Sequence, residues 1–573
     1  MTSMTTPTFA AEGLLMRLKA HGIDYLFANG GTDFAPVIEG FANGMAKELA
    51  MPRPVIVPHE TAAIGMAHGY YLATGKPQAV MVHVNVGLGN CVMGIINAAG
   101  ENIPMLVLSG RTPLTEFGRP GARMSPVQYG QEMRDQAGMI RELVKWDYEM
   151  RYGDQVDVLI DRAMTIAMNE PRGPVYLSLP REPLAEALGG DWSMGRPLQA
   201  VPVAPAPDAL AIRETAQLLA KAKNPLIICQ RGDPEGRVSQ ALAGLASDFA
   251  LPVVEYWSVR NVLPTGHPMH CGFDLAQWLP EADVILVVDS QVPWVQRSLK
   301  PRPGAKVIHV GPDPLFSRMP ARSHPIDLAI VSSPAAALKA LHEELKRLAP
   351  QTAGRYKAIE ERSRARREKA KEIAQAGGKA TPMTAPYVSR CLSEAMDPNA
   401  VMFTELSAKQ DFLELAGPNR CFSTAPSGGL GWGLPAALGA SLAERDRLVI
   451  ATVGDGSYIF ANPVACHQIA EAHRLPLLVV VYNNGIWNAV RSATLSMYPK
   501  GQAASMNVLP ITSLEPAPDY AQIAAASRGW SENVETPAEL PGAIQRALNV
   551  IRTEKRQALL NVRVAIPPAP PPG

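Results

Sequence analysis

Two short polar motifs stand directly after apolar runs in the last third of the chain. Asp455 lies between Gly454 and Gly456 after the run LVIATV, and Asn483 and Asn484 follow the run LPLLVVVY. The apolar runs are typical of buried parallel strands, and NPVACHQIAEAHR between them predicts a crossover helix. Because the carboxyl ends of neighbouring parallel strands meet at one edge of a sheet, we expect the carboxylate and the amides to lie together. Such oxygen donors favour Mg²⁺ with phosphate.

The residues next to Asp455 also suit a phosphate group. Gly454 and Gly456 would let backbone N–H groups come close, Ser457 would add a hydroxyl, and the following helix would direct its positive end inward. Either motif alone would more often be a simple tight turn. Their occurrence together, after two strands joined by a helix, favours a metal and diphosphate site.

An acid in the first third of the chain has a comparable position. The run PVIVPHETAAIGMAHGYYLATG places Glu60 directly after a predicted strand, at the start of a helix. On its own, a glutamate in the first turn is a favourable partner of the helix dipole.

The elements that position these residues form a repeating pattern. Short β-branched runs alternate with helical stretches, which indicates βαβ units, and the Pro/Ala-rich QAVPVAPAPDA marks a boundary near Pro202. We predict an α/β fold of three doubly wound parallel-sheet domains. Their ranges are 1–190, 203–345 and 381–566, with a connector over 346–380 and a disordered proline-rich tail over 567–573. The charged stretch 338–376 predicts one solvated helix.

Composition narrows the partners and the compartment. The 573 residues are 47% apolar and 19% charged with a net charge of +1, and no basic block suggests nucleic acid. No apolar run reaches the roughly 18 residues that a membrane span needs. The amino-terminal segment lacks a secretion signal, and the six cysteines are scattered as in reduced core thiols. We expect a cytoplasmic protein without a membrane partner.

The order GDGS, then NNG, resembles the thiamin diphosphate signature of the acetolactate synthase, pyruvate oxidase and benzoylformate decarboxylase group. The resemblance extends over nearly the whole chain and implies pyrimidine-binding, central and diphosphate-binding domains in that order. It implies thiamin diphosphate and Mg²⁺ as cofactors, with Asp455, Asn484 and the backbone carbonyl of Ile486 as metal ligands. The interval is slightly longer than usual, and YIFANPV carries the excess.

Other segments imply contacts with the cofactor. FSTAPSGGLGWGLPAALGAS is similar to the segment that opens the diphosphate domain, where Leu430 would hold the cofactor bent. FTELS is similar to a cofactor-lining strand end, and ANGGTDFAPVIE to a loop facing the cofactor ring. The implied cofactor contacts are Asn29, Gly31, Thr32, Glu405, Ser407, Gly429, Leu430, Gly454, Gly456, Ser457, Asn484 and Ile486.

The resemblance gives three residues a catalytic role. Glu60 would hydrogen-bond N1′ of the aminopyrimidine, so that the cofactor attacks a 2-oxo acid and accepts the electrons when CO₂ leaves. His83, in VHVNVGLGN, matches the active-site histidine of benzoylformate decarboxylases, with a structural histidine as the alternative. MRDQAGMIRELVKWDY resembles an acetolactate synthase stretch and indicates Gln136 and Lys145, although a surface ion pair also explains Lys145.

Several functions stay open at this point. Gln136 favours decarboxylation with carboligation, as in acetolactate synthase, which we prefer slightly; His83 favours simple decarboxylation. A non-catalytic nucleotide- or cofactor-binding regulatory protein is the third reading. FAD in the central domain is possible, but no GxGxxG motif supports it. The expected partners are a small 2-oxo acid, a second carbonyl acceptor, and further copies of the chain in a homodimer or dimer of dimers with shared active sites.

Overall fold

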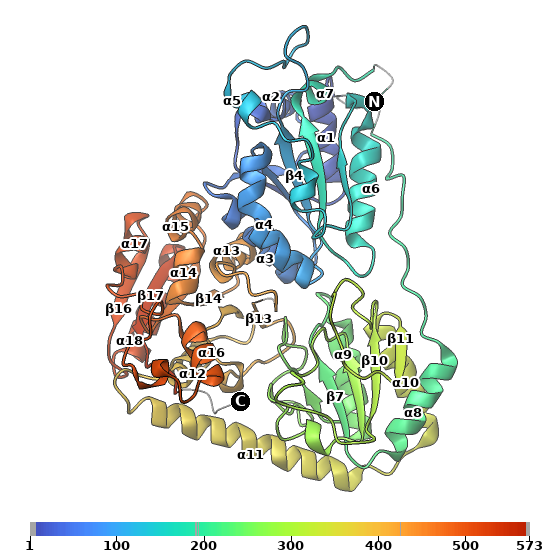
Figure 1. Ribbon diagram of the computed structural model, residues 1–573, viewed down its shortest axis with the longest axis vertical. Coiled ribbons are helices and arrows are strands. Elements are labelled where there is room, and N and C mark those ends of the chain that lie inside the picture. Colours follow the sequence, from blue (N-terminus) through green and yellow to red (C-terminus); the bar gives the residue numbers. More distant parts are fainter. Residues whose placement is uncertain (1–6, 190–191, 193, 425, 569–573) are drawn as a thin grey trace. The chain divides into compact units, whose positions relative to one another are not determined.

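The computed structural model describes residues 7–189, 192, 194–424 and 426–568, which form three parallel sheets flanked by helices (Figure 1). The predicted three-domain α/β fold is therefore confirmed, whereas its domain boundaries remain predictions. Most of the predicted tail, residues 569–573, lies outside the described residues.

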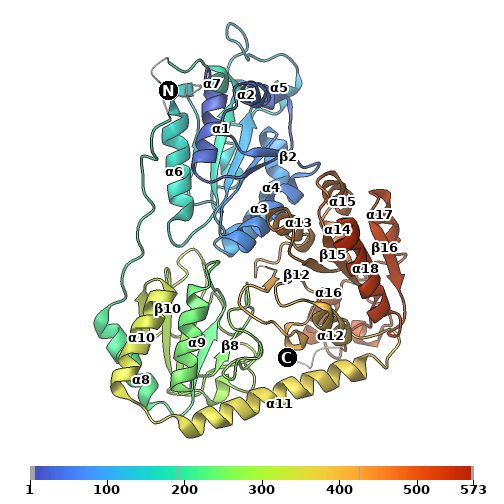
Figure 2. The ribbon, with the colours of Figure 1, turned by 180° about the vertical axis from the view of Figure 1, so that it is seen from behind.

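The first sheet has the strand order β2-β1-β3-β4-β6-β5, all pairs parallel. Helices cover both faces: Figure 1 shows α4 on one face, and Figure 2 shows α1 and α6 on the other. β3 and β4 are buried on both sides, which explains why their sequences are continuously apolar. The strands are β1 Tyr25–Ala28, β2 Arg53–Ile56, β3 Ala79–Val82, β4 Leu106–Arg111, β5 Asp147–Glu149 and β6 Val175–Pro180; the helices are α1 Ala10–Ala20, α2 Ala35–Ala46, α3 Glu60–Thr74, α4 Val84–Gly100, α5 Val127–Gly130, α6 Val156–Met168 and α7 Arg181–Ala185.

Two helices from later in the chain belong to the same compact unit. They are α13 Gly433–Ala443 and α15 Pro463–Ala472. Helix α13 packs directly on α3, where a Cβ at Gly69 would lie 1.9 Å from the Ala436 carbonyl oxygen. Small residues at the crossing bring the two helix backbones together, and this position of α13 was not evident from the sequence.

The central sheet has the order β11-β10-β9-β7-β8. Its core includes the apolar side of α10, with Leu338, Leu341 and Leu345 buried. The strands are β7 Pro225–Cys229, β8 Val253–Val254, β9 Val284–Val288, β10 Lys306–Gly311 and β11 Leu328–Val331; the helices are α8 Ala209–Lys221, α9 Arg237–Phe249 and α10 Pro334–Leu348.

The charged stretch 338–376 forms two helices, so the prediction of a single one was wrong. Helix α10 ends where Ala349 adopts a left-handed conformation (φ +44°) before Pro350, which disfavours continued α-helix. The 25-residue α11, Ala353–Gly377, follows as the connector and contacts α12 (Figure 2). Only this second helix is largely solvated.

The third sheet has the order β13-β12-β14-β15-β17-β16. β14 and β15 are parallel neighbours with Val453 opposite Val481 and Gly454 opposite Tyr482, as predicted. The strands are β12 Val401–Glu405, β13 Cys421–Ser423, β14 Val449–Gly454, β15 Leu477–Asn483, β16 Trp530–Val534 and β17 Ala558–Arg563; the helices are α12 Ala385–Ala395, α14 Asp455–Phe460, α16 Asn488–Met497, α17 Tyr520–Ala526 and α18 Leu540–Glu554.

Two further findings concern the chain as a whole. The six cysteines are free thiols, five of them buried and Cys391 partly so. Within the described ranges, every helix is too short or too polar to cross a bilayer.

Candidate active site

Asp455 begins α14 immediately after β14 and is almost completely buried, with 3% of its surface exposed. Its Oδ1 accepts the N–H of Gly456 at 2.9 Å. Its Oδ2 accepts the N–H groups of Asn484 at 3.1 Å and Gly485 at 2.7 Å, beyond the end of β15. The two motifs therefore lie together at one edge of the sheet, as the strand pattern predicted.

The environment of Asp455 fits a divalent cation. Burial raises the pKa of the Asp455 carboxyl, and the three backbone N–H groups only partly oppose this rise. A metal ion would offset the remaining cost of the buried negative charge. The other two predicted ligand oxygens follow β15: Asn484 Oδ1 accepts the Ile486 N–H at 3.1 Å, and the Ile486 carbonyl accepts the Asn488 N–H at 2.9 Å. Such an all-oxygen set suits Mg²⁺.

The three glycines near Asp455 differ in why the structure would exclude a side chain at their positions. Gly485 has φ +71°, and a Cβ there would lie 2.6 Å from Glu515 Oε1. A Cβ at Gly456 would lie 2.1 Å from the Trp487 ring, so this glycine makes room for an indole. Only Gly454 faces open space, with Ser457 Oγ at 3.9 Å from its would-be Cβ. Helix α14 has just six residues, so its dipole is weaker than the sequence suggested.

The end of β12 brings two more predicted residues to the same edge of the third sheet. Glu405 pairs with Val453 of β14 and is fully buried, and Ser407 is buried two residues later. Leu406 between them has φ +55° and a 56% exposed side chain. A left-handed leucine is uncommon and strained conformations cluster at functional sites, which supports the choice of this segment. The sequence did not predict the left-handed conformation of Leu406.

Glu60 is the first residue of α3 and is 7% exposed. Its Oε2 accepts a hydrogen bond from Asn90 Nδ2 of α4 at 3.0 Å. Helix α4 comes close because Gly87 has no side chain: a Cβ there would lie 3.2 Å from Glu60 Oε1. The carboxylate is therefore held between two helices by one neutral donor. Asn90 lies in the quoted VHVNVGLGN segment but was not singled out.

His83 follows β3 at the start of α4 and has two polar partners. Its Nδ1 donates to Asp33 Oδ1 at 2.5 Å, and its Nε2 lies 3.2 Å from Gln131 Nε2. The hydrogen bond with Asp33 raises the pKa of His83; burial opposes the rise, and the charges of Asp33 and Glu60 add to it. Sequence reasoning missed Asp33 and Gln131. Asp33 stands next to the predicted Thr32, whereas Gln131 carried no signal.

Gln136 is anchored in the scaffold. Its Nε2 donates to Ser109 Oγ at 2.8 Å, the Gly110 carbonyl at 2.9 Å and Tyr176 Oη at 3.0 Å, and the side chain is buried. These contacts fasten the segment around Gln136 to β4 and β6. The amide nitrogen is thus committed to structural contacts, whereas Oε1 is buried without a hydrogen-bond partner among the described residues.

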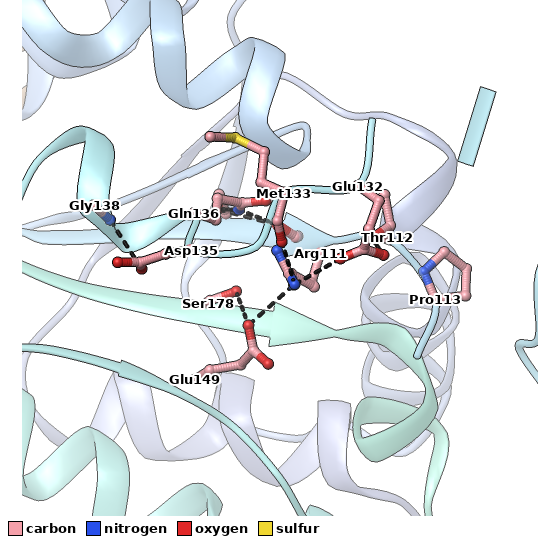
Figure 3. Close-up of polar contacts among 12 residues, drawn as sticks. Arg111, Thr112, Pro113, Glu132, Met133, Asp135, Gln136, Gly138, Glu149 and Ser178 are labelled. Atoms are coloured by element: carbon pink, nitrogen blue, oxygen red, sulfur yellow. Dashed lines mark hydrogen bonds and ion pairs between the residues drawn. The ribbon is translucent and has the colours of Figure 1, made fainter. Parts of the chain in front are cut away.

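A second anchor of the same segment lies at Arg111, at the end of β4. Its Nη2 donates to Glu132 Oε1 at 2.7 Å and to the Met133 carbonyl at 2.8 Å, and its Nε lies 3.1 Å from Glu149 Oε2 (Figure 3). Gln131 therefore reaches His83 from a segment that Arg111 anchors at the Glu132 side chain and the Met133 carbonyl. Lys145 donates to the carbonyl oxygens of Ile166 and Asn169 near the end of α6.

The remaining predicted residues surround His83 and α4. Asn29 follows β1, and a Cβ at Gly31 would lie 2.1 Å from His83 Nδ1; Thr32 starts the short turn that carries Asp33. Gly429, just before Leu430, exchanges two hydrogen bonds with the Asn97 side chain of α4 at 2.8 and 3.1 Å. Asn97 was not foreseen, because it lies far away along the chain.

The comparisons with known proteins match both parts of the chain that carry the candidate residues, the first third and the last third. Residues 9–139 match the thiamine pyrophosphate enzyme N-terminal TPP binding domain, 212–341 the central domain and 406–562 the C-terminal TPP binding domain. The chain belongs to the thiamine pyrophosphate enzymes. Glu60 and His83 of this thiamine pyrophosphate enzyme lie in the first match, and Asp455 and Asn484 in the last. Thiamin diphosphate, the same compound, is therefore its cofactor.

The similar proteins include a decarboxylase and a probable synthase. The chain is 28% identical over 554 residues to benzoylformate decarboxylase of Pseudomonas aeruginosa, covering 93% of this chain and 95% of that protein. It is 25% identical over 564 residues to a probable acetolactate synthase of Mycobacterium bovis, covering 96% and 95%. The crystal structure of benzoylformate decarboxylase from Polynucleobacter necessarius matches with a TM-score of 0.79 over 99% and 100% of the two chains at 22% identity. This thiamine pyrophosphate enzyme is thus a lyase or transferase of known fold.

Proposed function

We propose that the protein decarboxylates a 2-oxo acid and releases the aldehyde, as the name of its relative benzoylformate decarboxylase describes. The observation that carries this choice is the contrast between His83 and Gln136. His83 is partly exposed and hydrogen-bonded to a carboxylate, whereas Gln136 is buried in contacts with the scaffold. Gln136 and the general sequence pattern favour carboligation, and the scaffold contacts of the Gln136 amide nitrogen weaken the first of these two arguments.

The chain's own residues divide the work as follows. Asp455, Asn484 and the Ile486 carbonyl would hold Mg²⁺, and the metal would hold the diphosphate. Glu60 would keep a proton at N1′ of the aminopyrimidine, and His83 would exchange a proton with the substrate carbonyl oxygen. Thiamin diphosphate supplies the nucleophilic carbon and the electron sink for loss of CO₂. The cofactor contacts predicted from the sequence are retained in this proposal.

Transfer of the acyl unit to a second carbonyl compound is the second candidate. Similarity to a probable acetolactate synthase over 96% of the chain favours it. Both candidates use the same steps up to CO₂ loss, because they differ only in whether a proton or a carbonyl carbon receives the new bond. A small aldehyde or 2-oxo acid would be the acceptor.

We also propose a cytoplasmic homodimer or dimer of dimers in which Glu60 of one subunit serves Asp455 of another. The free, mostly buried cysteines are consistent with a reducing compartment. FAD forms no part of the proposed function, and a flavin absorption spectrum in the purified protein would contradict that.

A panel of aliphatic and aromatic 2-oxo acids tests the proposal, with thiamin diphosphate and Mg²⁺ present, with and without added aldehydes. Products are identified by mass spectrometry, and Glu60→Gln is the control for background chemistry. Aldehyde release from a 2-oxo acid supports the first candidate. A 2-hydroxy ketone as the main product supports the second, and absence of CO₂ from every acid would overturn both.

A further inference from the structure

The Asp33 carboxylate joins two neighbouring groups at the end of β3. Its Oδ1 accepts the Nδ1–H of His83 at 2.5 Å, and its Oδ2 accepts the backbone N–H of Val84 at 3.3 Å. Asp33 is 3% exposed, while 22% of the His83 side chain remains accessible. One carboxylate thus fixes both the imidazole ring and the backbone that carries it.

The surrounding backbone leaves room for this pair at two glycines. A Cβ at Gly31 would lie 2.1 Å from His83 Nδ1, and a Cβ at Gly110 would lie 1.5 Å from Asp33 Oδ2. Val84 adopts φ +34°, which is an outlier for a β-branched residue. Such strain persists only where the surrounding contacts impose it, and the Asp33 carboxylate holds the Val84 N–H directly.

The other ring nitrogen has a different kind of partner. Gln131 lies 3.2 Å from His83 Nε2. A primary amide serves either protonation state of that nitrogen: its NH₂ donates to a neutral imidazole, and after a half-turn its oxygen accepts from an imidazolium. The carboxylate of Asp33, by contrast, accepts only from Nδ1–H. Proton exchange is therefore compatible with Nε2 and not with Nδ1.

We propose that Asp33 is a positioning residue that keeps the proton on Nδ1 of His83, so that His83 exchanges a proton with the substrate only through Nε2. This inference rests on the proposed function. As the substrate carbonyl oxygen gains negative charge, the Nε2–H proton passes to it and His83 becomes neutral. When the product carbonyl re-forms, the hydroxyl proton returns to Nε2, so His83 neither gains nor loses a proton over the cycle. The one proton that the reaction consumes forms the C–H bond of the aldehyde and comes from the solvent.

The charges around His83 support this role. The groups that face it are Asp33 and Glu60, and His59 Nδ1 lies 4.0 Å from Glu60 Oε2. The pKa of His83 is raised, chiefly by the hydrogen bond to Asp33. A raised pKa keeps the imidazolium, the proton-donating form, present at higher pH. Removal of the Asp33 charge therefore lowers the pKa of His83 and moves the loss of the acid form to lower pH.

The same unit contains a matched pair with the opposite exposure. His68 Nε2 lies 2.7 Å from Glu101 Oε2, with side chains 1% and 0% exposed. This second histidine–carboxylate pair is inaccessible to a substrate, and no hydrogen bond joins it to a candidate residue within the described part of the chain. Glu101→Gln is thus a control for the general cost of neutralising a buried carboxylate beside a histidine.

The test compares wild type, Asp33→Asn and Glu101→Gln as holoenzymes. The first readout is the rate of His83 modification by diethyl pyrocarbonate against pH, resolved by peptide mass spectrometry. We expect Asp33→Asn to shift the His83 midpoint to lower pH and Glu101→Gln to leave it in place. We also expect Asp33→Asn to lower kcat by about 10- to 100-fold, by analogy with the loss of the carboxylate partner of a metal-ligating histidine. An unchanged midpoint in Asp33→Asn would overturn the inference.

A double-mutant comparison separates positioning from mere structural support. In a His83→Gln background, Asp33→Asn should have little further effect on kcat, because Asp33 acts through His83. An equal loss in both backgrounds would show that Asp33 acts independently and overturn the proposal. If no 2-oxo acid is turned over, the proposed function fails, while a shifted His83 midpoint still supports the Asp33–His83 pairing. If turnover is found and the midpoint does not move, the proposed function stands and the inference fails.

Discussion

Carboxylates at the ends of the first and third sheets are held in different ways. Glu60 and Asp33 have side-chain partners, Asn90 and His83, and Asp33 also accepts one backbone N–H, whereas the Asp455 carboxylate accepts three backbone N–H groups and no side-chain donor is recorded for it within the described residues. Side-chain partners can rotate or ionise, so they accompany a change of protonation. Backbone N–H groups cannot, and the three at Asp455 favour its charged form. The first arrangement suits proton exchange and the second suits a metal.

The largest expected effect tests the fixed charge. We expect Asp455→Ala to abolish retention of thiamin diphosphate, because the diphosphate would lose the Mg²⁺ that offsets its charge. Isothermal calorimetry with thiamin diphosphate and Mg²⁺ measures this directly. Unchanged Mg²⁺-dependent binding in a folded Asp455→Ala protein would show that the backbone-held carboxylate is not a metal ligand.

The next effect tests the proton-exchanging arrangement. Glu60→Gln keeps the shape of the side chain but removes the acid, and loss of such a group typically costs about 10² to 10⁴ in rate. We expect this variant to bind cofactor normally and to exchange the thiazolium C2 proton slowly, as measured by quenched-flow NMR. Wild-type exchange in Glu60→Gln would be incompatible with the assigned role.

Mixing these two variants tests whether the two arrangements serve one another across subunits. If Glu60 of one chain serves Asp455 of another, a mixed Glu60→Gln and Asp455→Ala dimer contains one intact site. We therefore expect partial recovery of activity after subunit exchange. Mixed dimers verified by native mass spectrometry that stay inactive would rule out the shared-site assembly.

A smaller effect concerns the loop that supplies the backbone N–H groups. Gly485→Ala forces a side chain into a left-handed conformation and against Glu515, at a cost of about 1 to 2 kcal/mol in the free energy of unfolding. We expect weaker Mg²⁺-dependent cofactor binding as well, because the Gly485 N–H bonds to Asp455. The control is Gly304→Ala, which has φ +81° and open space around it. It should lose similar stability, by urea unfolding, without weaker binding; equal weakening in both would contradict the prediction.

The smallest effect concerns the pH dependence of stability, which depends on a second carboxyl group that accepts backbone N–H groups. Glu255 in the central part accepts the N–H groups of Val262 and Leu263 at 2.8 and 2.7 Å, and its Oε1 lies 3.6 Å from His270 Nε2. Burial raises the pKa of Glu255 from 4.5 to about 8. The folded protein therefore keeps a proton that the unfolded chain loses, and stability should fall as pH rises through this window and level off above it.

The expected slope is at most about 1.4 kcal/mol per pH unit from this one group. Urea unfolding of wild type and Glu255→Gln at several pH values measures the difference. Glu255→Gln should show a shallower decline, because it has no proton to lose. Parallel curves for the two proteins would mean that Glu255 is ionised in the folded state.

Sequence alone determined much of the third-sheet edge. The apolar runs before Asp455 and Asn484 formed neighbouring parallel strands, and the polar residues met at their carboxyl ends as predicted. This succeeded because the pattern is local: a buried parallel strand is continuously apolar, and the residue after it must emerge at the sheet edge. The start of α3 at Glu60 followed from the same kind of signal.

Only the tertiary structure decided which side chains meet around these residues. Asp33 reaches His83 over 50 positions of sequence, and Gln136 turns into the scaffold while Gln131, five residues earlier, lies beside the imidazole. No periodic pattern in the sequence predicts either contact. Each contact depends on where a glycine leaves room for a side chain and on how a loop is anchored to the sheet. Strand and helix signals depend on residues that are neighbours along the chain. A hydrogen bond between side chains that are distant along the chain depends instead on how the helices and strands pack, which the sequence pattern does not show.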